Sequence, residues 1–153
     1  MSFGGKSNLV DAVLQELRLS ACADIFGDTW DGSDGVQKFA ADYAPAVEPP
    51  WLVVMEPGET YEYMSPDEGF HRPFIAEGVL QVSIFAEDRQ QARELGDAVA
   101  RALNDVPLDW VGAQWRYLRL ASAGFQPVGS TGPGVPTLFN RVLSFSYAYQ
   151  GVL

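Results

Sequence analysis

The stretch that decides the fold is Val79-Leu80-Gln81-Val82-Ser83-Ile84-Phe85-Ala86-Glu87-Asp88. Leu80, Val82 and Ile84 alternate at a period of two with Gln81, Ser83 and Phe85, of which only Phe85 is apolar. Such alternation is typical of a strand with one buried face. The pattern predicts a long strand from Phe74 to Ala86.

A helix is predicted directly after this strand. Asp88 is a favoured N-cap residue, and an apolar stripe follows it at spacings of three and four. The stripe consists of Ala92, Leu95, Gly96, Val99 and Leu103. We therefore expect an amphipathic helix that packs on the strand before it.

Upstream, five further elements are expected. A first helix, capped by Ser7, has one apolar face formed by Leu9, Val10, Val13, Leu14 and Leu17. A Gly- and Asp-rich loop over 27–35 leads to a short helix over 36–43 that Pro45 would stop. Short strands are predicted at Trp51–Met55 and Tyr61–Met64.

Downstream, the chain reads as two strands around a long loop. Residues Trp115–Leu120 are predicted to form a strand, and a loop is predicted over 126–136. In the last strand, alternate side chains share one face, namely Leu143, Phe145, Tyr147 and Tyr149. The order predicts an α/β (α+β) fold, with an antiparallel or mixed sheet and helices packed on one face. We expect one domain, 1–153, with flexible ends at 1–6 and 151–153.

Composition narrows the functional classes. The chain has 153 residues, 47% of them hydrophobic, and carries 20 acidic against 10 basic residues. A net charge of −10 disfavours sequence-specific nucleic acid binding, although it suits a wall along which DNA slides without sticking. With one cysteine, no signal peptide and no long apolar run, we expect synthesis in the cytoplasm and no membrane insertion.

The sequence offers little catalytic chemistry. His71 is the one histidine, Cys22 the one cysteine, and the glycine-rich stretch 129–134 lacks the lysine of a phosphate-binding loop. Asp28, Asp31 and Asp34 do not have the spacing of a calcium loop. We predict no catalytic residue, cofactor or metal, and keep as an alternative a small acidic domain that binds a metal or ligand through these aspartates and His71.

Aromatic side chains on strands and loops are candidates for protein contacts. We place the interface on the loops 57–73 and 126–137, the alternative being that these loops are merely flexible. The candidate interface residues are Trp30, Tyr61, Tyr63, Phe70, His71, Arg72, Phe125 and Phe139.

Three segments occur in a characteristic order: Pro50-Trp51-Leu52-Val53-Val54, the strand 79–88 with its helix, and the last strand, Arg141-Val142-Leu143-Ser144-Phe145-Ser146-Tyr147. In this order of parts, over residues 7–150, the chain resembles the tail-terminator or tail-completion proteins of long-tailed bacteriophages. The extra length over 27–43 departs from this resemblance and leaves the position within the neck open.

This resemblance implies a virion protein of the tail or neck without enzymatic activity. Its subunits would form a homo-oligomeric ring, commonly a hexamer, that caps the tail tube and docks on the head-side connector or stopper protein. Another neck protein, such as a head-tail stopper or adaptor, is the alternative within this class.

Overall fold

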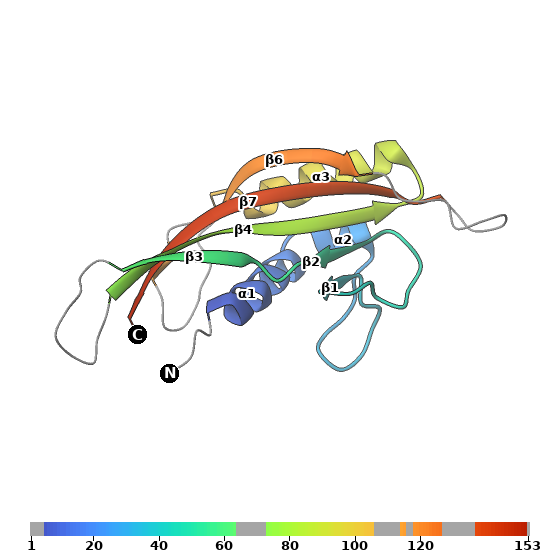
Figure 1. Cartoon of the computed structure of the whole chain (residues 1–153). Coiled ribbons are helices and arrows are strands. Elements are labelled where there is room, and N and C mark those ends of the chain that lie inside the picture. Colours follow the sequence, from blue (N-terminus) through green and yellow to red (C-terminus); the bar gives the residue numbers. More distant parts are fainter. Residues whose placement is uncertain (1–4, 64–72, 106–113, 116–117, 127–136, 153) are drawn as a thin grey trace.

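The computed structural model describes residues 5–63, 73–105, 114–115, 118–126 and 137–152. Its elements are α1 (Gly5–Leu19), α2 (Cys22–Phe26), β1 (Phe39–Ala41), β2 (Trp51–Val54), β3 (Gly58–Tyr63), β4 (Pro73–Ala86), α3 (Arg89–Leu103), β5 (Gln114–Trp115), β6 (Arg119–Gln126) and β7 (Phe139–Val152). They form one mixed sheet with helices on one face, as predicted (Figure 1). None of the described helices is long and apolar enough to cross a membrane.

The sheet is built on a ribbon of two long antiparallel strands, β4 and β7. Both have 14 residues, and their register runs unbroken from Pro73 opposite Val152 to Ala86 opposite Phe139. Figure 1 shows the two strands side by side along the molecule. The shorter strands flank this ribbon: β2 and β3 pair with successive parts of β4, and β6 and β5 with successive parts of β7.

One face of the ribbon is the core. The side chains that point to the helices are buried, namely Phe74, Ala76, Leu80, Val82, Ile84 and Ala86 from β4 and Leu143, Phe145, Tyr147 and Tyr149 from β7. The predicted apolar faces of α1 and α3 complete the same cluster. The predicted alternation of the two strands is therefore confirmed.

The opposite face of the ribbon is not covered by a helix. Val79 is 52% exposed, and Glu77 and Ser146 are also exposed. Phe85, the apolar exception on this face, stacks on Trp51 from β2, with ring centroids 4.4 Å apart. Next to this stack, Ser83 and Val53 are also buried, whereas the part of the face around Glu77, Val79 and Ser146 is open to solvent.

Several expectations about local structure were wrong. The predicted helix over 36–43 is instead the three-residue strand β1, because Phe39 is fully buried opposite Leu52 and Asp42 turns the chain with a φ of 65°. A short apolar run suits helix or strand equally, and here pairing with β2 decides.

Other differences concern the boundaries of elements. The helix α2 was not predicted, and Ser7 lies inside α1 rather than at its cap. The strand expected at Trp115–Leu120 is divided between β5 and β6, and β6 continues to Gln126. At the ends of the described chain, α1 begins at Gly5 and β7 ends at Val152.

Candidate assembly surfaces

The described members of the predicted interface set lie at different places on the sheet. Tyr63 is opposite Phe74 at one end of β4, whereas Phe139 is opposite Ala86 at the other. Phe74 and Ala86 are twelve positions apart along β4, which corresponds to roughly 40 Å at about 3.3 Å per residue. Phe70, His71 and Arg72 lie outside the described residues, as does most of the loop 126–137.

Tyr61 and Tyr63 lie on β3 near the first residues of β4. Both rings meet Phe74 edge to face, with centroids 5.4 and 6.2 Å away. Tyr61 is half-buried against the core, while Tyr63 is 50% exposed. Tyr63 is thus the more accessible candidate at this end, and Tyr61 serves packing.

Glu59 is the centre of a polar cluster at this end of the sheet. Its carboxylate accepts hydrogen bonds from the hydroxyls of Tyr147 at 2.7 Å, Tyr61 at 2.9 Å and Tyr149 at 3.2 Å. The first of these links β3 to β7 across the intervening β4. The cluster therefore fastens β3 to β7 through one carboxylate.

The electrostatics of the cluster keep the phenols protonated. Burial raises the pKa of Tyr147 and of Tyr149, and the nearby Glu59 carboxylate raises both further. Burial and the hydrogen bond to Glu59 also raise the pKa of Tyr61. A phenol that donates to a carboxylate must keep its proton, so the geometry and the direction of these shifts agree. We interpret the cluster as structural.

Phe125 is the centre of a second, positively charged cluster. The guanidinium carbons of Arg89, Arg141 and Arg93 lie 4.7, 4.9 and 5.8 Å from its ring centroid. Such distances allow cation–π attraction. Phe125 comes from β6, Arg141 from its partner position on β7, and the other two from the first turns of α3. We call these four residues the arginine cluster.

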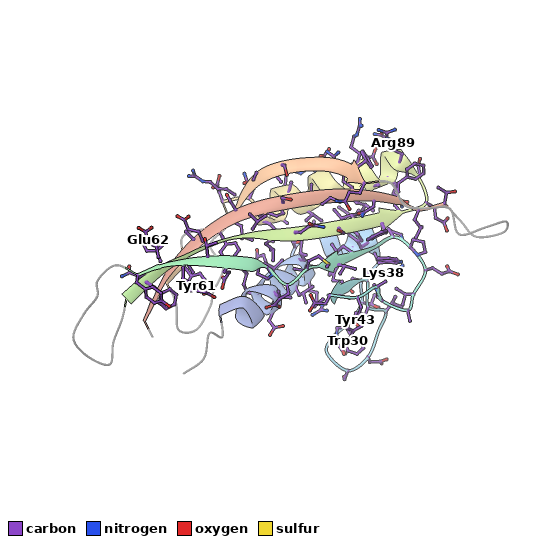
Figure 2. All side chains as sticks on the ribbon, viewed as in Figure 1. Trp30, Lys38, Tyr43, Tyr61, Glu62 and Arg89 are labelled. Carbon is purple, nitrogen blue, oxygen red and sulfur yellow. The ribbon has the colours of Figure 1, made fainter. Side chains whose placement is uncertain are left out.

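Phe139 and Trp30 have separate surroundings. Phe139 is half-buried and packs against the core, so it is largely a structural residue. Trp30 is half-buried in the loop that follows α2, beside a run of exposed residues at 31–36. Figure 2 shows Trp30 beyond β1, far from Tyr61 and from Arg89.

The loop around Trp30 holds its two exposed aspartates in fixed positions. One carboxylate oxygen of Asp31 accepts hydrogen bonds from the Ser33 amide at 2.9 Å and the Asp34 amide at 2.7 Å, and Asp34 accepts one from the Gly35 amide at 2.9 Å. The Ser33 and Asp34 amides lower the pKa of Asp31, which keeps it charged. We call residues 30–35 the acidic loop.

Asp28, the third aspartate of the region, does not share this role. It is only 9% exposed, accepts a hydrogen bond from the Lys38 amide at 2.7 Å and lies 3.8 Å from the Nε of Arg18. It therefore ties the base of the loop to α1 and to the residue directly before β1. Within the described parts of the chain, no three His, Cys, Asp or Glu side chains are grouped as a metal site requires.

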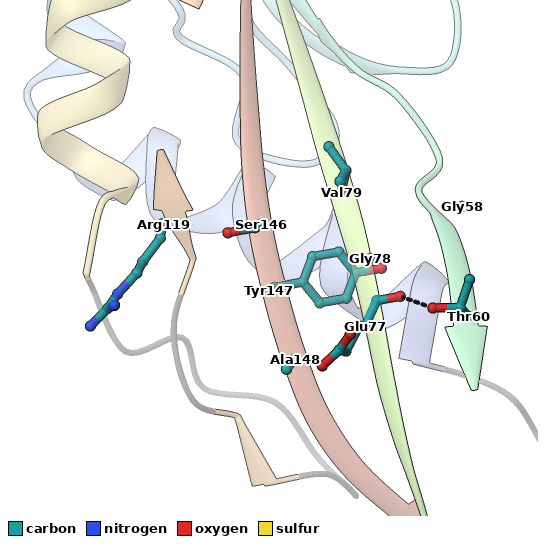
Figure 3. Close-up of a pocket in the computed structure, with 9 residues that line it drawn as sticks. All are labelled: Gly58, Thr60, Glu77, Gly78, Val79, Arg119, Ser146, Tyr147 and Ala148. Carbon is teal, nitrogen blue, oxygen red and sulfur yellow. Dashed lines mark hydrogen bonds between the residues drawn. The ribbon is translucent and has the colours of Figure 1, made fainter. Parts of the chain in front are cut away.

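Two of the hollows on the described surface are shallow. One, of about 600 Å³, lies on the uncovered sheet face among Gly58, Thr60, Glu77, Val79, Arg119, Ser146 and Ala148 (Figure 3). The other, of about 530 Å³, is mostly apolar and is formed by residues 45–49 with Trp51 and Leu138. Both are wide open, so their shape suits contact with a broad surface better than enclosure of a small ligand.

Cys22 is a core residue. It is 2% exposed, and burial raises the pKa of its thiol. A buried thiol in its protonated form is a poor nucleophile, so Cys22 serves packing, as its sequence context predicted.

The sequence prediction missed Glu59, Arg141 and the role of the arginines on α3. The sequence did contain a pattern that could have identified Arg141. It alternates in phase with Leu143 and Phe145, so its charged side chain had to lie on the buried face of the strand. Likewise, Glu59 alternates in phase with Tyr61. A charged residue in phase with the buried face of a strand needs a specific partner, because burying an unpaired charge is costly.

Comparisons with known proteins give a likeness of fold. No family model matches the chain, and no curated sequence matches it either. Among solved structures, the chain is similar to a chain of a structure described as the virion of a native gene transfer agent particle, with 18% identity and a TM-score of 0.61. The match covers 98% of this chain and 100% of the other, so this chain shares the whole fold of that virion component.

Proposed function

We propose that this chain is a structural protein of a phage-like virion, and more specifically a tail terminator. In this role, copies of the chain form a ring that caps the tail tube and joins it to the connector on the head side. The observation that carries the proposal is the likeness of fold, over the full length of both chains, to a component of a gene transfer agent virion. The order of strands and helices that resembles tail terminators supports the finer assignment.

The surface chemistry is compatible with assembly. A ring of identical subunits needs two different, complementary surfaces on each copy. The sheet provides them, because its two edges differ: β1 with the acidic loop lies at one edge, and β6 with the arginine cluster at the other. The long uncovered face between the edges adds a third surface for partners of another kind.

The net charge of −10 also fits a neck component. DNA that passes through a channel must not be held by its walls, and acidic walls offer no phosphate-binding sites. The charge does not distinguish a terminator from another neck protein, such as a stopper or adaptor.

Light scattering and electron microscopy test the proposal. The purified chain, alone and mixed with the tail-tube and connector proteins encoded beside it, would be measured for mass and imaged. A ring, with a mass near six times 16.7 kDa for a hexamer, that binds the end of tail tubes is expected. A chain that stays monomeric and binds neither partner would refute the proposal, while rings that bind only the head-side connector would favour a stopper or adaptor.

Calcium and zinc titration tests the remaining alternative, a small metal-binding domain. Calorimetry and melting curves with either metal would reveal binding, because a ligand specific for the folded state raises stability. We expect neither heat nor a shift in melting temperature.

A further inference from the structure

The arginine cluster is a concentration of positive charge on an acidic protein. It contains three of the ten basic residues of the chain. Across the described residues, the ion pairs are Arg18 with Asp28 and Arg119 with Asp105, so none of these three arginines has a carboxylate partner there. The Nε of Arg141 is buried and has no hydrogen-bond partner among those residues.

The carboxylates next to the cluster in the sequence make no ion pair with it among the described residues. The carboxylate of Asp88 accepts hydrogen bonds from the backbone amides of Gln90 and Gln91 and so caps the helix. The carboxylate of Glu94 accepts a hydrogen bond from the side-chain amide of Gln90 at 3.2 Å. Glu87 is exposed and makes no ion pair in the described part of the chain. A guanidinium over an aromatic ring still has five N–H donors around its edge, and a carboxylate is the group that matches them in pairs.

The acidic loop offers such carboxylates in fixed positions. Residues 31–36 are all exposed, and Asp31 and Asp34 are held by backbone amides of their own loop. Trp30 adds a half-buried aromatic ring at the base. Charged groups that are already ordered lose little entropy on binding, and aromatic and arginine side chains are enriched at the centres of interfaces.

The two surfaces lie on opposite sides of the molecule. The strand order places β1 at one edge of the sheet and β6 beyond β7 at the other. Figure 2 shows Arg89 and Trp30 on opposite sides of the ribbon. The two surfaces of one copy therefore cannot meet each other, but they can meet in a head-to-tail contact between two copies.

We infer that the arginine cluster of one copy binds the acidic loop of the next, with Arg89 and Arg93 pairing with Asp31 and Asp34. This inference rests on the proposed function, in which identical subunits form a ring, and names the contact that joins them. A contact of this kind uses different patches on its two sides, so it closes into a ring when the rotation between copies allows it.

Charge reversal tests the contact. The variant R89E/R93E would be compared with wild type by light scattering over a range of protein concentrations at about 0.05 M and about 1 M salt, where the screening length falls to about 3 Å. We expect wild type to assemble best at low salt, and the variant to lose at least about tenfold in association constant, since about 1.4 kcal/mol corresponds to tenfold. Both sites are exposed at the start of α3, where glutamate suits the helix dipole, so folding should be preserved.

R101E is the matched control, because it reverses one exposed charge further along the same helix. It is compared with the single variants R89E and R93E, which change the net charge by the same amount. R101E should assemble like wild type if the position of the charge matters rather than the total.

A charge swap makes the test specific. The variant D31K/D34K should also fail to assemble, whereas a mixture of it with R89E/R93E should recover, because alternating copies restore complementary pairs at every contact. Since Asp31 and Asp34 brace their own loop, D31N/D34N provides a second variant that keeps an acceptor oxygen at each position but removes the charge. It should weaken assembly while preserving the melting temperature.

The outcomes separate the contact from the proposed function. Rings of R89E/R93E as stable as those of wild type would overturn the contact and leave the ring itself standing. A wild-type chain that does not self-associate at low salt would also overturn the contact, and the proposed function would then be decided by binding to tail-tube or connector subunits.

Discussion

Gly78 on β4 and Tyr147 on β7 are directly opposite each other, and the tyrosine occupies the space that any larger residue at position 78 would need. A Cβ at Gly78 would lie 2.5 Å from the Tyr147 hydroxyl oxygen and 2.8 Å from the Gly58 carbonyl oxygen. The same hydroxyl donates to Glu59 at 2.7 Å. The absence of a side chain at Gly78 therefore allows a tyrosine of β7 to reach a carboxylate of β3.

Substitution G78A should destabilise the protein. The new methyl group would displace the Tyr147 ring from Glu59 or push β3 outward, and overpacking of this kind costs about 1–3 kcal/mol. Urea unfolding followed by circular dichroism measures the loss. G58A is the matched control, because a Cβ there meets nothing within 4 Å and should change stability little. Equal effects at both positions would contradict the close approach of Tyr147.

The phenol cluster should make stability depend on alkaline pH. In the folded state the pKa of Tyr147 is raised above its ordinary value of 10.0, first by burial and then by Glu59. The folded protein therefore holds a proton that the unfolded chain releases above about pH 10, and stability falls as pH rises, by about 1.4 kcal/mol per pH unit for each such phenol. Below that pH this contribution is constant.

Y147F isolates this effect. It should cost about 1–3 kcal/mol near neutral pH, because Glu59 loses its shortest hydrogen bond. Its stability should then fall less steeply than that of wild type between pH 10 and 11, as measured by urea midpoints. Y43F, at a tyrosine that is 75% exposed, should follow the wild-type curve. Parallel curves for Y147F and wild type would argue against the raised pKa.

Local patterns were sufficient to predict β4, α3 and the buried face of β7. In each case the pattern is a repeat of apolar residues within one element, such as Leu80, Val82 and Ile84. These residues repeat because one face of the element is buried in the core. The fold class followed from the order of these elements. By contrast, β1 has only three residues, too few for any period, and its strand conformation depends on pairing with β2.

The candidate surfaces depend on contacts between distant segments. Phe125 is opposite Arg141 only because β6 pairs with β7 in one particular register, with a shift between Leu120 and Ser122. α3 then brings Arg89 to the same ring. The sequence patterns end the predicted strand at Leu120 and identify Phe125 only as an aromatic candidate for protein contacts. They do not specify this register, so its three cationic neighbours could not be predicted.

The cap of α3 should contribute to stability. The carboxylate of Asp88 accepts the amides of Gln90 and Gln91 at 3.4 and 3.3 Å, so D88A should lose about 1 kcal/mol. D88N retains an acceptor and should lose less. E87A removes an adjacent exposed carboxylate and is the control. If D88A and E87A unfold at the same urea concentration as wild type, the cap has no energetic role.

Two neighbouring residues of β4 provide the sharpest test of the sheet's two faces. Leu80 is fully buried against the helices, whereas Val79 is 52% exposed on the uncovered face. L80A should therefore lose about 2–5 kcal/mol, the cost of removing a large buried side chain and leaving a cavity, while V79A should change stability by about 0.5 kcal/mol or less. Urea unfolding of both variants measures the difference. A large loss for V79A in the isolated subunit would mean that this face is covered within the monomer, and if the loss appeared only in the assembled state, Val79 would lie in a contact with another subunit.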